Sequence, residues 1–235
     1  MKKISIIIPA FNEEKYLKKI ISKIKKINFK KINFNYDIIV VDDGSTDNSK
    51  KILKKTKGIK LLIQQNLGKG RAVQNGIKLS KADYILIQDA DLEYFPEDII
   101  KMLKKIKTTK IAIYGSRYLP LKYGVFPKRN KNQSFGPFVA NIAIMFLFWV
   151  LYRQKISDLL TGYKLYERNF FRRNRINTNG FETDHEISAK LVKKNYKIIE
   201  VPIKYRPRSI AEGKKINFFD GLKALKTIIL FRLYN

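Results

Sequence analysis

Residues 84–91 read YILIQDAD, a short apolar run that ends in two acids, Asp89 and Asp91. A run of this length predicts a buried strand. Two carboxylates one residue apart, just past a strand end, can converge on one hard cation. Mg²⁺ takes one or two such carboxylates and completes its shell with phosphate oxygens and water. The stretch therefore predicts a strand followed by a metal and diphosphate site, and the competing interpretation is a pair of turn or helix-capping acids ahead of Pro96.

Similar apolar runs alternate with stretches of helical spacing through the first half of the chain. We expect strands at 4–8, 36–41, 59–63, 84–88 and 111–114, and helices at 13–26, 46–55, 69–79 and 96–106. Such alternation is typical of βαβ units. The sequence therefore predicts an α/β fold with a mostly parallel central sheet flanked by helices.

Polar segments follow these expected strands. The segments are Asn12-Glu13, Asp42-Asp43-Gly44-Ser45, Asn66-Leu67-Gly68-Lys69-Gly70 and Asp89-Ala90-Asp91. Ligands of open parallel sheets bind outside the carboxyl ends of the strands. We therefore expect these segments to meet at one edge of the sheet and to form one binding site.

Asp42 and Asp43 precede a segment rich in turn-forming residues. An aspartate here can accept a hydrogen bond from a base N–H or a ribose hydroxyl. The segment can also form a tight turn in which Ser45 or Asp47 caps the next helix. Both interpretations can hold together, because different side chains carry them.

Lys69 lies between Gly68 and Gly70, directly ahead of a predicted helix. A permissive backbone at a helix N-terminus suits phosphate binding. The spacing is not that of a P-loop, and no G-x-G-x-x-G follows the first strand. Nucleoside-triphosphate hydrolysis and dinucleotide binding are therefore disfavoured.

Further charged residues lie later in the chain. Guanidinium and ammonium groups commonly clamp phosphates, and the candidates here are Arg117, Arg208 and Lys214. Solvated loop charges are an equal alternative for these three. A hydroxyl acceptor needs a general base, whereas a phosphate acceptor is already ionised and needs none. The candidate bases are Asp158, Asp184 and Glu186.

The second half of the chain contains a stretch at 138–152 that is apolar except for Asn141. It is shorter than the ~20 residues that span a bilayer, so we expect a buried or interfacial helix. The pattern then predicts a strand at 163–166, a helix at 182–194 and a strand at 197–205. A last helix at 217–234 carries an apolar stripe and can lie on a membrane or pack on its own domain. The stripe contains Phe218, Leu222, Leu225, Ile229 and Leu233.

Composition limits the functional classes. The chain has 235 residues, 45% of them apolar, and no cysteine, so a single α/β domain fits and thiolate chemistry is excluded. A net charge of +29 implies polyanionic partners, although lysine runs are usually solvated helix faces. The single His185 excludes a multi-histidine metal site, and we expect it to be a surface or capping residue. Met1-Lys2-Lys3 leads directly into a strand, so we expect a cytoplasmic location.

Five of these segments resemble family 2 of the glycosyltransferases in order and spacing. They are residues 5–14, 40–47, 66–70, 89–93 and 115–117. Within the family the chain looks most like polyprenyl-phosphate glycosyltransferases such as the dolichol-phosphate mannose synthases. The resemblance implies a GT-A fold and an inverting transfer from a nucleotide-diphosphate sugar, either GDP-mannose or a UDP-sugar. It covers nearly the whole chain.

The resemblance also implies roles for individual residues. Asp91, assisted by Asp89, would hold Mg²⁺ or Mn²⁺ and face the diphosphate. Asp91, Arg117 and Asp184 would be catalytic, and a cation near Arg129 would help to bind the acceptor. The nucleotide-sugar-binding residues would be Pro9, Ala10, Phe11, Glu13, Val41, Asp42, Asp43, Lys69, Asp89, Ala90, Glu93, Arg208 and Lys214.

We divide the expected single GT-A domain into a nucleotide-binding half at 1–118, an acceptor-side half at 119–216 and a terminal amphipathic helix at 217–235. The expected acceptor is a polyprenyl phosphate in an anionic membrane, with the protein peripherally associated on the cytoplasmic side. One alternative is a soluble family member that glycosylates a sugar hydroxyl, with Asp184 as the base. A nucleic-acid-binding protein would account for the charge, but acidic strand-end loops would repel a phosphate backbone, so we expect no nucleic-acid partner.

Overall fold

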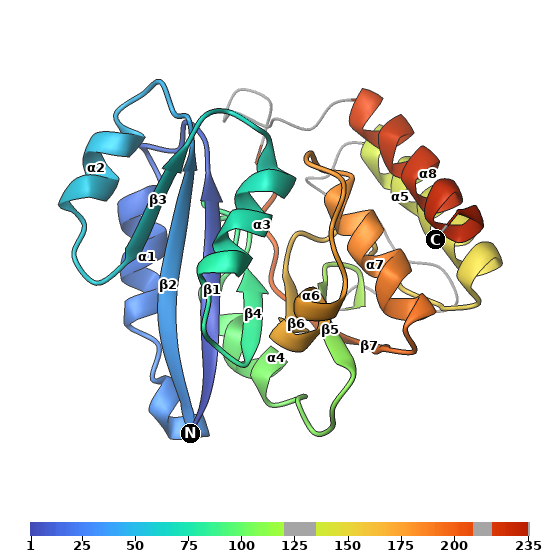
Figure 1. Cartoon of the computed structure of the whole chain (residues 1–235), viewed down its shortest axis with the longest axis horizontal. Helices are drawn as coiled ribbons and strands as arrows, with labels where there is room; N and C mark the ends of the chain where they lie inside the picture. Colours follow the sequence, from blue (N-terminus) through green and yellow to red (C-terminus); the bar gives the residue numbers. More distant parts are fainter. Residues whose placement is uncertain (120–134, 209–217, 235) are drawn as a thin grey trace.

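The computed structural model describes residues 1–119, 135–208 and 218–234, without the side chains of Pro137 and Phe218. Within these ranges the core is a seven-stranded sheet in the order β3-β2-β1-β4-β6-β5-β7 (Figure 1). The strands are β1 (Lys2–Ala10), β2 (Phe34–Asp43), β3 (Lys60–Gln64), β4 (Tyr84–Ile87), β5 (Ile111–Ser116), β6 (Lys164–Glu167) and β7 (Lys197–Pro202).

Helices connect and cover these strands. The α-helices are α1 (Leu17–Lys25), α2 (Ser49–Lys55), α3 (Lys69–Leu79), α4 (Ile99–Leu103), α5 (Phe135–Tyr152), α6 (Arg168–Arg173), α7 (Thr183–Lys193) and α8 (Phe218–Leu233). Two short 3₁₀ helices are η1 (Phe29–Ile32) and η2 (Pro96–Asp98).

Two apolar cores lie on the two faces of the sheet, because successive side chains of a strand point to opposite faces. In β1, Ile6 and Ile8 belong to the core that α1, α2 and α4 cover, whereas Ile7 belongs to the core covered by α3, α5, α7 and α8. Gly76 lets α3 approach closely, since a Cβ there would lie 2.6 Å from Ile7 Cγ2. The burial of both faces explains the near-continuous apolar runs of the central strands.

The sheet confirms the predicted α/β fold with a mostly parallel sheet. Among the described strands, β6 alone runs against its neighbours, since it pairs antiparallel with both β4 and β5. The start of β6 therefore lies beside the end of β4, with Lys164 opposite Ile87. This reversal was not predicted, and it adds the residues before β6 to the edge where the parallel strands end.

Most predicted elements are present, with shifted ends. The helix expected at 69–79 is α3. The helix expected from residue 13 begins at Leu17, because the preceding residues form a turn in which Tyr16 N and Leu17 N donate to Glu13 O. The helix expected at 46–55 begins at Ser49, whose N–H donates to Asp47 Oδ1 at 2.8 Å. The helix expected at 96–106 is divided into η2 and α4, and η1 and α6 were not predicted.

The two most apolar helices pack side by side at the end of the molecule farthest from α2 (Figure 1). α8 docks on its own domain through Ala224, Ile228 and Phe231, which are buried. Leu222 and Leu233, which belong to the predicted stripe, are exposed instead. No described helix is both long and apolar enough to cross a bilayer.

Candidate active site

The carboxyl ends of the parallel strands and the start of β6 share one edge of the sheet, at the top of Figure 1. This edge brings together side chains that are far apart in the sequence. Ion pairs connect Lys69 with Asp89, Arg208 with Asp91, and Lys164 with Asp184. The predicted gathering of acidic residues from separate strand ends is therefore present.

Asp89 and Asp91 follow β4 and each contacts a cationic side chain. Lys69 Nζ lies 2.7 Å from Asp89 Oδ1, and Arg208 Nη2 lies 2.7 Å from Asp91 Oδ2. Burial, followed by the charges of Asp89 and Glu93, raises the pKa of Asp91 to about 7, even though Arg208 acts in the opposite direction. Burial is the largest cause, so the raised pKa of Asp91 reflects its removal from solvent first and its neighbouring carboxylates second.

Arg208 contacts carboxylates from two different strand ends. Its Nη1 lies 3.3 Å from Glu13 Oε2, after β1, while its Nε lies 3.6 Å from Glu93 Oε1, after β4. Glu93 also fixes the chain around Arg208, because it accepts hydrogen bonds from Arg208 N at 2.8 Å and from the Tyr205 hydroxyl at 3.0 Å. Glu93 therefore positions the segment after β7 against the site.

Arg117 follows β5 and is paired with Asp158. Its Nε and Nη2 donate to the two carboxylate oxygens of Asp158, both at 2.7 Å, and its backbone N–H donates to the same group. Asp158 is fully buried, and Glu200 on β7 holds the backbone N–H groups of Ser157 and Asp158. This bidentate pair ties the loop before β6 to the end of β5.

Asp184, in the first turn of α7, lies near the buried Lys164 and the partly exposed Lys69. Lys164 Nζ is 3.6 Å from Asp184 Oδ1 and also donates to Leu159 O at 3.1 Å. Burial alone would raise the pKa of Asp184, but the charges of Lys164 and Lys69 outweigh burial and lower it. Asp184 is therefore held as a carboxylate.

His185 is next to Asp184, and of its two predicted roles, as a surface or a capping residue, the surface role is wrong. Its side chain is only 3% exposed, and Nδ1 has no hydrogen-bond partner in the described part of the chain. Burial lowers its pKa to about 3, so the ring is neutral. The first turn of α7 is covered in the folded chain, since Thr183 and Glu186 are buried as well.

Asp43 and Asp42, at the end of β2, have opposite surroundings. Asp43 accepts hydrogen bonds from Gln64 Nε2 at 2.7 Å and from the N–H groups of Leu67 and Gly68 at 2.9 and 3.0 Å. Both oxygens of Asp42 are buried and lack a hydrogen-bond partner among the described residues. Asp43 thus orders the loop before α3, while Asp42 keeps its full hydrogen-bonding capacity.

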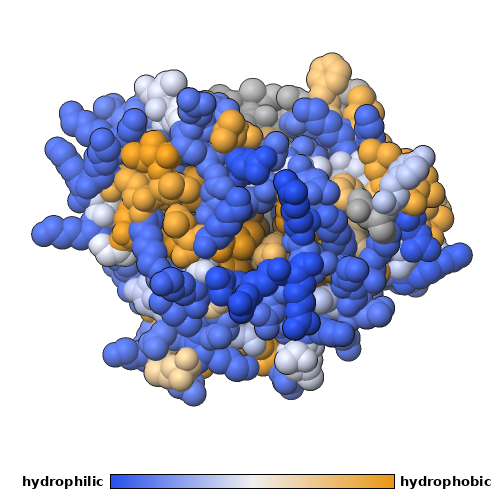
Figure 2. Space-filling view, in the orientation of Figure 1, coloured by the Kyte–Doolittle hydropathy of each residue, from blue (hydrophilic) through white to orange (hydrophobic). Residues whose placement is uncertain are grey.

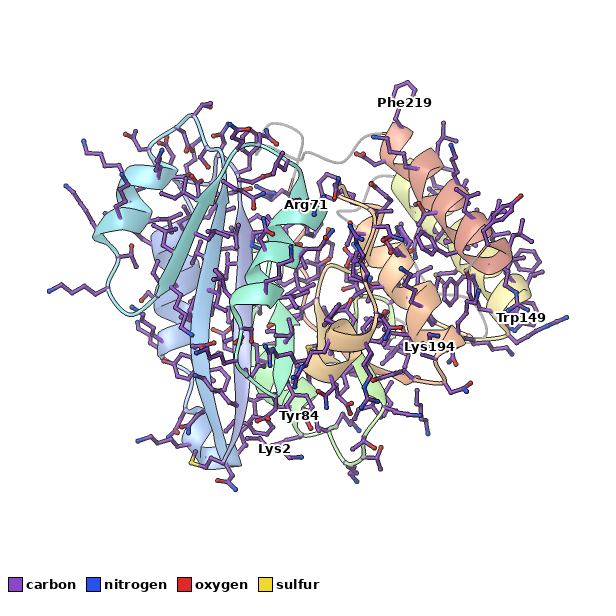
Figure 3. All side chains as sticks on the ribbon, in the orientation of Figure 1. Lys2, Arg71, Tyr84, Trp149, Lys194 and Phe219 are labelled. Atoms are coloured by element: carbon purple, nitrogen blue, oxygen red, sulfur yellow. The ribbon has the colours of Figure 1, made fainter. Side chains whose placement is uncertain are left out.

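The glycines beside Lys69 have a packing role that the sequence did not reveal. Asn179 O accepts a hydrogen bond from Arg71 N at 3.0 Å and lies 2.7 Å from where a Cβ on either Gly68 or Gly70 would be. The loop before α7 therefore covers the N-terminus of α3, where Figure 3 labels Arg71. Lys69 reaches past this loop to Asp89 with its side chain.

The remaining predicted residues are at the same edge or outside the described ranges. Pro9 and Phe11 are partly exposed at the end of β1, whereas Ala10, Val41 and Ala90 are buried. Val41 packs in the core beneath α3, so its side chain is covered. Lys214 and Arg129 lie outside the described residues.

Sequence reasoning missed residues that lie at the start of β6. Lys164 is fully buried beside Asp184, and Gly162 packs directly against Asp89 Oδ2. Tyr94, after β4, receives a hydrogen bond from Gly162 N at 3.0 Å. The signal available in the sequence was the segment at 157–164, but its place at this edge depends on the direction of β6.

Comparisons with known proteins identify the family of the chain. The model of the family described as "Glycosyl transferase family 2" matches residues 5–175. Over 258 residues the chain is 30% identical to a UDP-N-acetylglucosamine–dolichyl-phosphate N-acetylglucosaminyltransferase of Methanococcus voltae, covering 99% of this chain and 97% of that protein. Over 251 residues it is 30% identical to a dolichyl-phosphate beta-glucosyltransferase of Dictyostelium discoideum, covering 97% and 73%.

A solved structure shares the fold. Glucosyl-3-phosphoglycerate synthase from Mycobacterium tuberculosis, in complex with Mn²⁺, UDP and glucosyl-3-phosphoglycerate, superposes with a TM-score of 0.71 at 17% identity. The superposition covers 98% of this chain and 80% of that one. At this level of identity the likeness shows the fold alone.

Proposed function

The chain belongs to glycosyl transferase family 2 and has the GT-A fold, and from this premise we propose that it moves a sugar from a nucleotide diphosphate to a polyprenyl phosphate. It is a glycosyltransferase, and two relatives that match nearly all of it are named for transfer to dolichyl phosphate. The proposal follows their acceptor chemistry. It leaves GDP and UDP as alternative nucleotides.

The single observation that carries the acceptor assignment is the surroundings of Asp184. A general base for a hydroxyl acceptor works best when its pKa is near the working pH. The pKa of Asp184 is instead lowered by Lys164 and Lys69. A phosphate acceptor is already ionised at neutral pH and needs no such base, so Asp184 serves as a fixed anion that holds the two ammonium groups.

The acids after β4 fit a divalent cation, which we propose to be Mg²⁺ or Mn²⁺. Asp89 and Asp91 are hard oxygen donors that already attract one cationic side chain each at 2.7 Å. The described residues contain no group of three potential metal ligands, and two carboxylates leave the other positions of such an ion to phosphate oxygens and water. The ion would neutralise the charge that develops on the diphosphate leaving group.

Other residues of the chain are assigned to the nucleoside, the diphosphate and the acceptor. We assign the nucleoside to the ends of β1 and β2, where the buried oxygens of Asp42 have no hydrogen-bond partner among the described residues and suit a base N–H or a ribose hydroxyl. Lys69 and Arg208 lie beside the metal-binding acids and are assigned to the diphosphate. Arg117 and the loop that Asp158 anchors are assigned to the acceptor side. The other predicted donor contacts are Pro9, Ala10, Phe11, Glu13, Val41, Asp43, Ala90, Glu93 and Lys214.

A lipid acceptor requires access to a membrane, and the outward side of the α5–α8 pair suits this. Figure 2 shows apolar side chains gathered over these two helices, and Figure 3 shows Phe219 and Trp149 at the outer rim of the molecule. We call this surface the outer face. It consists of the exposed residues Phe135, Val139, Phe146, Trp149, Val150, Phe219, Leu222, Ile229, Leu230, Leu233 and Tyr234.

The chemistry of the outer face favours an anionic lipid surface. Exposed apolar patches of this kind mark interaction sites, and aromatic residues prefer the membrane interface. Three exposed cations, Lys223, Lys226 and Arg232, lie among the apolar residues of α8. The net charge of +29 adds attraction to anionic headgroups. We therefore propose peripheral attachment through this face.

Vesicle flotation tests the attachment. Phe146→Glu and Leu233→Glu change residues that are 61% and 67% exposed, and each should reduce flotation with anionic vesicles. Leu79→Glu is the matched control, because Leu79 is also exposed, at 42%, but lies on α3. Equal flotation of all three variants and the wild type would remove the outer face from the proposal.

A substrate panel tests the activity. UDP- and GDP-sugars are screened by thermal shift with Mn²⁺, and the stabilising donors are then incubated with a polyprenyl phosphate, the matching polyprenol or simple sugars. The proposal expects product only with the lipid phosphate. Transfer to a sugar hydroxyl with no response to polyprenyl phosphate would favour the soluble alternative.

A further inference from the structure

Arg208 occupies a central place among the acids of the site. One short contact, 2.7 Å from Nη2 to Asp91 Oδ2, is accompanied by longer approaches of 3.3 Å to Glu13 and 3.6 Å to Glu93. Nε is buried and has no hydrogen-bond partner among the described residues. The guanidinium is thus attracted by three carboxylates of the described residues, and its shortest ion pair is with Asp91.

The main chain around Arg208 is fixed by hydrogen bonds that do not involve the ion pair between its guanidinium and Asp91. Glu93 accepts the hydrogen bond of Arg208 N at 2.8 Å and that of the Tyr205 hydroxyl at 3.0 Å, while Arg206 N donates to Glu93 O at 3.0 Å. Changing the partner of the guanidinium therefore needs only rotation of the side chain. The backbone keeps the residue at the edge of the site.

A divalent cation and the guanidinium of Arg208 compete for the same group. Both need Asp91, since the short ion pair of Arg208 uses one of the two carboxylate oxygens that the proposed metal site offers. A diphosphate offers Arg208 an alternative anionic partner, and guanidinium groups bind phosphate oxygens well. Binding of the cation to Asp91 releases Arg208 for the diphosphate, and binding of the diphosphate to Arg208 releases Asp91 for the cation.

We propose that Arg208 couples metal binding to diphosphate binding by exchanging Asp91 for the diphosphate as its ion-pair partner. The inference rests on the proposed function, because it takes the diphosphate of a nucleotide sugar as the second partner. It assigns Arg208 a positioning role beyond contact with the donor. Because coupling between two ligands is reciprocal, the factor by which UDP strengthens Mn²⁺ binding equals the factor by which Mn²⁺ strengthens UDP binding.

A simple electrostatic role predicts a different result. In both cases, removing the positive charge strengthens the binding of Mn²⁺ alone, since the acids lose a competing cation. A simple counter-ion leaves the coupling factor between Mn²⁺ and UDP unchanged or increases it. If Arg208 exchanges Asp91 for the diphosphate, removal of its guanidinium makes the coupling factor fall. The coupling factor is therefore the decisive quantity.

The experiment measures Mn²⁺ affinity by electron paramagnetic resonance on chelator-treated full-length protein. It also measures UDP affinity by calorimetry with and without saturating Mn²⁺, and GDP is run in parallel. Arg208→Gln should bind Mn²⁺ alone about fivefold or more tightly than the wild type, and its coupling factor should fall by roughly tenfold. Arg208→Lys, which keeps the charge but loses the forked donor, should lie between the two. Arg173→Gln removes an exposed charge on α6 and should match the wild type.

The outcomes separate this inference from the proposed function. An unchanged coupling factor in Arg208→Gln, in a variant that melts as the wild type does, overturns the exchange. If Arg208→Gln does not fold, an unchanged coupling factor in Arg208→Lys has the same meaning. A wild-type protein that binds neither UDP nor GDP in the presence of Mn²⁺ contradicts the proposed function itself.

Discussion

The ammonium nitrogen of Lys164 lies 3.6 Å from Asp184 Oδ1, and the side chain of Lys164 is fully buried. The pair joins the antiparallel strand β6 to the first turn of α7. Burial lowers the pKa of Lys164, whereas the charges of Asp184 and Asp158 oppose that effect. Each partner thus favours the charged form of the other.

This relationship predicts the effect of Asp184→Asn. If Asp184 holds Lys69 and Lys164 and takes no proton, kcat/KM should fall by no more than about a hundredfold, because a general base contributes ~10²–10⁴-fold. The shape of the pH profile should not change. The measurement is transfer to polyprenyl phosphate between pH 6 and 9. A loss beyond a thousandfold, together with loss of the acid limb of the profile, would restore Asp184 as a base.

Asp91→Asn should abolish transfer while making the folded protein more stable at pH 8. A carboxyl group whose pKa is about 7 when folded and about 4 when unfolded loses its stabilising contribution as the pH rises through that window. The amide avoids this loss, and we expect a gain of about 1–2 kcal/mol. Urea unfolding at pH 5 and pH 8 measures it. A variant that is less stable than the wild type at pH 8 contradicts the raised pKa of Asp91.

Replacement of Glu93 should weaken donor binding through the chain that Glu93 holds. Glu93→Ala removes the acceptor for Arg208 N and for the Tyr205 hydroxyl, so we expect the donor KM to rise roughly tenfold, since a lost hydrogen bond to a charged group costs about 1.5–3 kcal/mol. Glu93→Gln keeps a carbonyl oxygen for Arg208 N and should have a smaller effect. Equal donor KM values for both variants and the wild type would remove this positioning role.

Gly70→Ala should destabilise the fold, since the new Cβ would lie 2.7 Å from Asn179 O and would also overlap the hydroxyl of Thr183. Overpacking of this kind costs about 1–3 kcal/mol. Gly221→Ala in α8 is the control, because a Cβ there meets nothing within 4 Å. The control should gain up to about 1 kcal/mol from helix propensity. Thermal melting compares the two, and an unchanged Tm for Gly70→Ala would contradict the packing of the loop before α7.

His185 makes the fold sensitive to acid. Its pKa is about 3 when folded and about 6.5 when unfolded, so the unfolded chain binds more protons between these values. The stability that neutral His185 allows is present above pH 6.5 and is lost as the pH falls, by up to about 1.4 kcal/mol per pH unit. His185→Gln should flatten the decline between pH 6.5 and 4 in urea unfolding. Parallel declines for variant and wild type would show that the histidine is not buried.

The parallel half of the fold was predictable because the helical connections between the strands imply the directions of the strands. Each strand there is followed by a helix, and a crossover between neighbouring strands makes them parallel. The ends of β1, β2 and β4 had therefore to share one edge, and their polar segments with them. This reasoning placed Asp43, Asp89 and Asp91 at one edge of the sheet from the sequence alone.

The second half of the site was not predictable by the same reasoning. β6 has only four residues, and nothing in their pattern fixes the direction of a strand. Lys164 was assigned to an expected strand and not to the site for that reason. The bidentate pair between Arg117 and Asp158 joins residues 41 positions apart. The periodicity of a local segment does not predict a contact over such a separation. The burial of His185 depends on the packing of α7, which local spacing does not define.

The antiparallel direction of β6 allows two parts of this sheet edge to change separately during evolution. The carboxyl ends of β4 and β5 lie at the edge of the sheet that holds the acids, whereas β6 has its amino end there. Residues 154–163, which precede β6, therefore reach this edge from outside the βαβ units. The length or composition of residues 154–163 can change during evolution without shifting the register of β1, β2 and β4. Under the proposed function, the ends of β1, β2 and β4 would keep their nucleotide site while the segment before β6 changed with the acceptor.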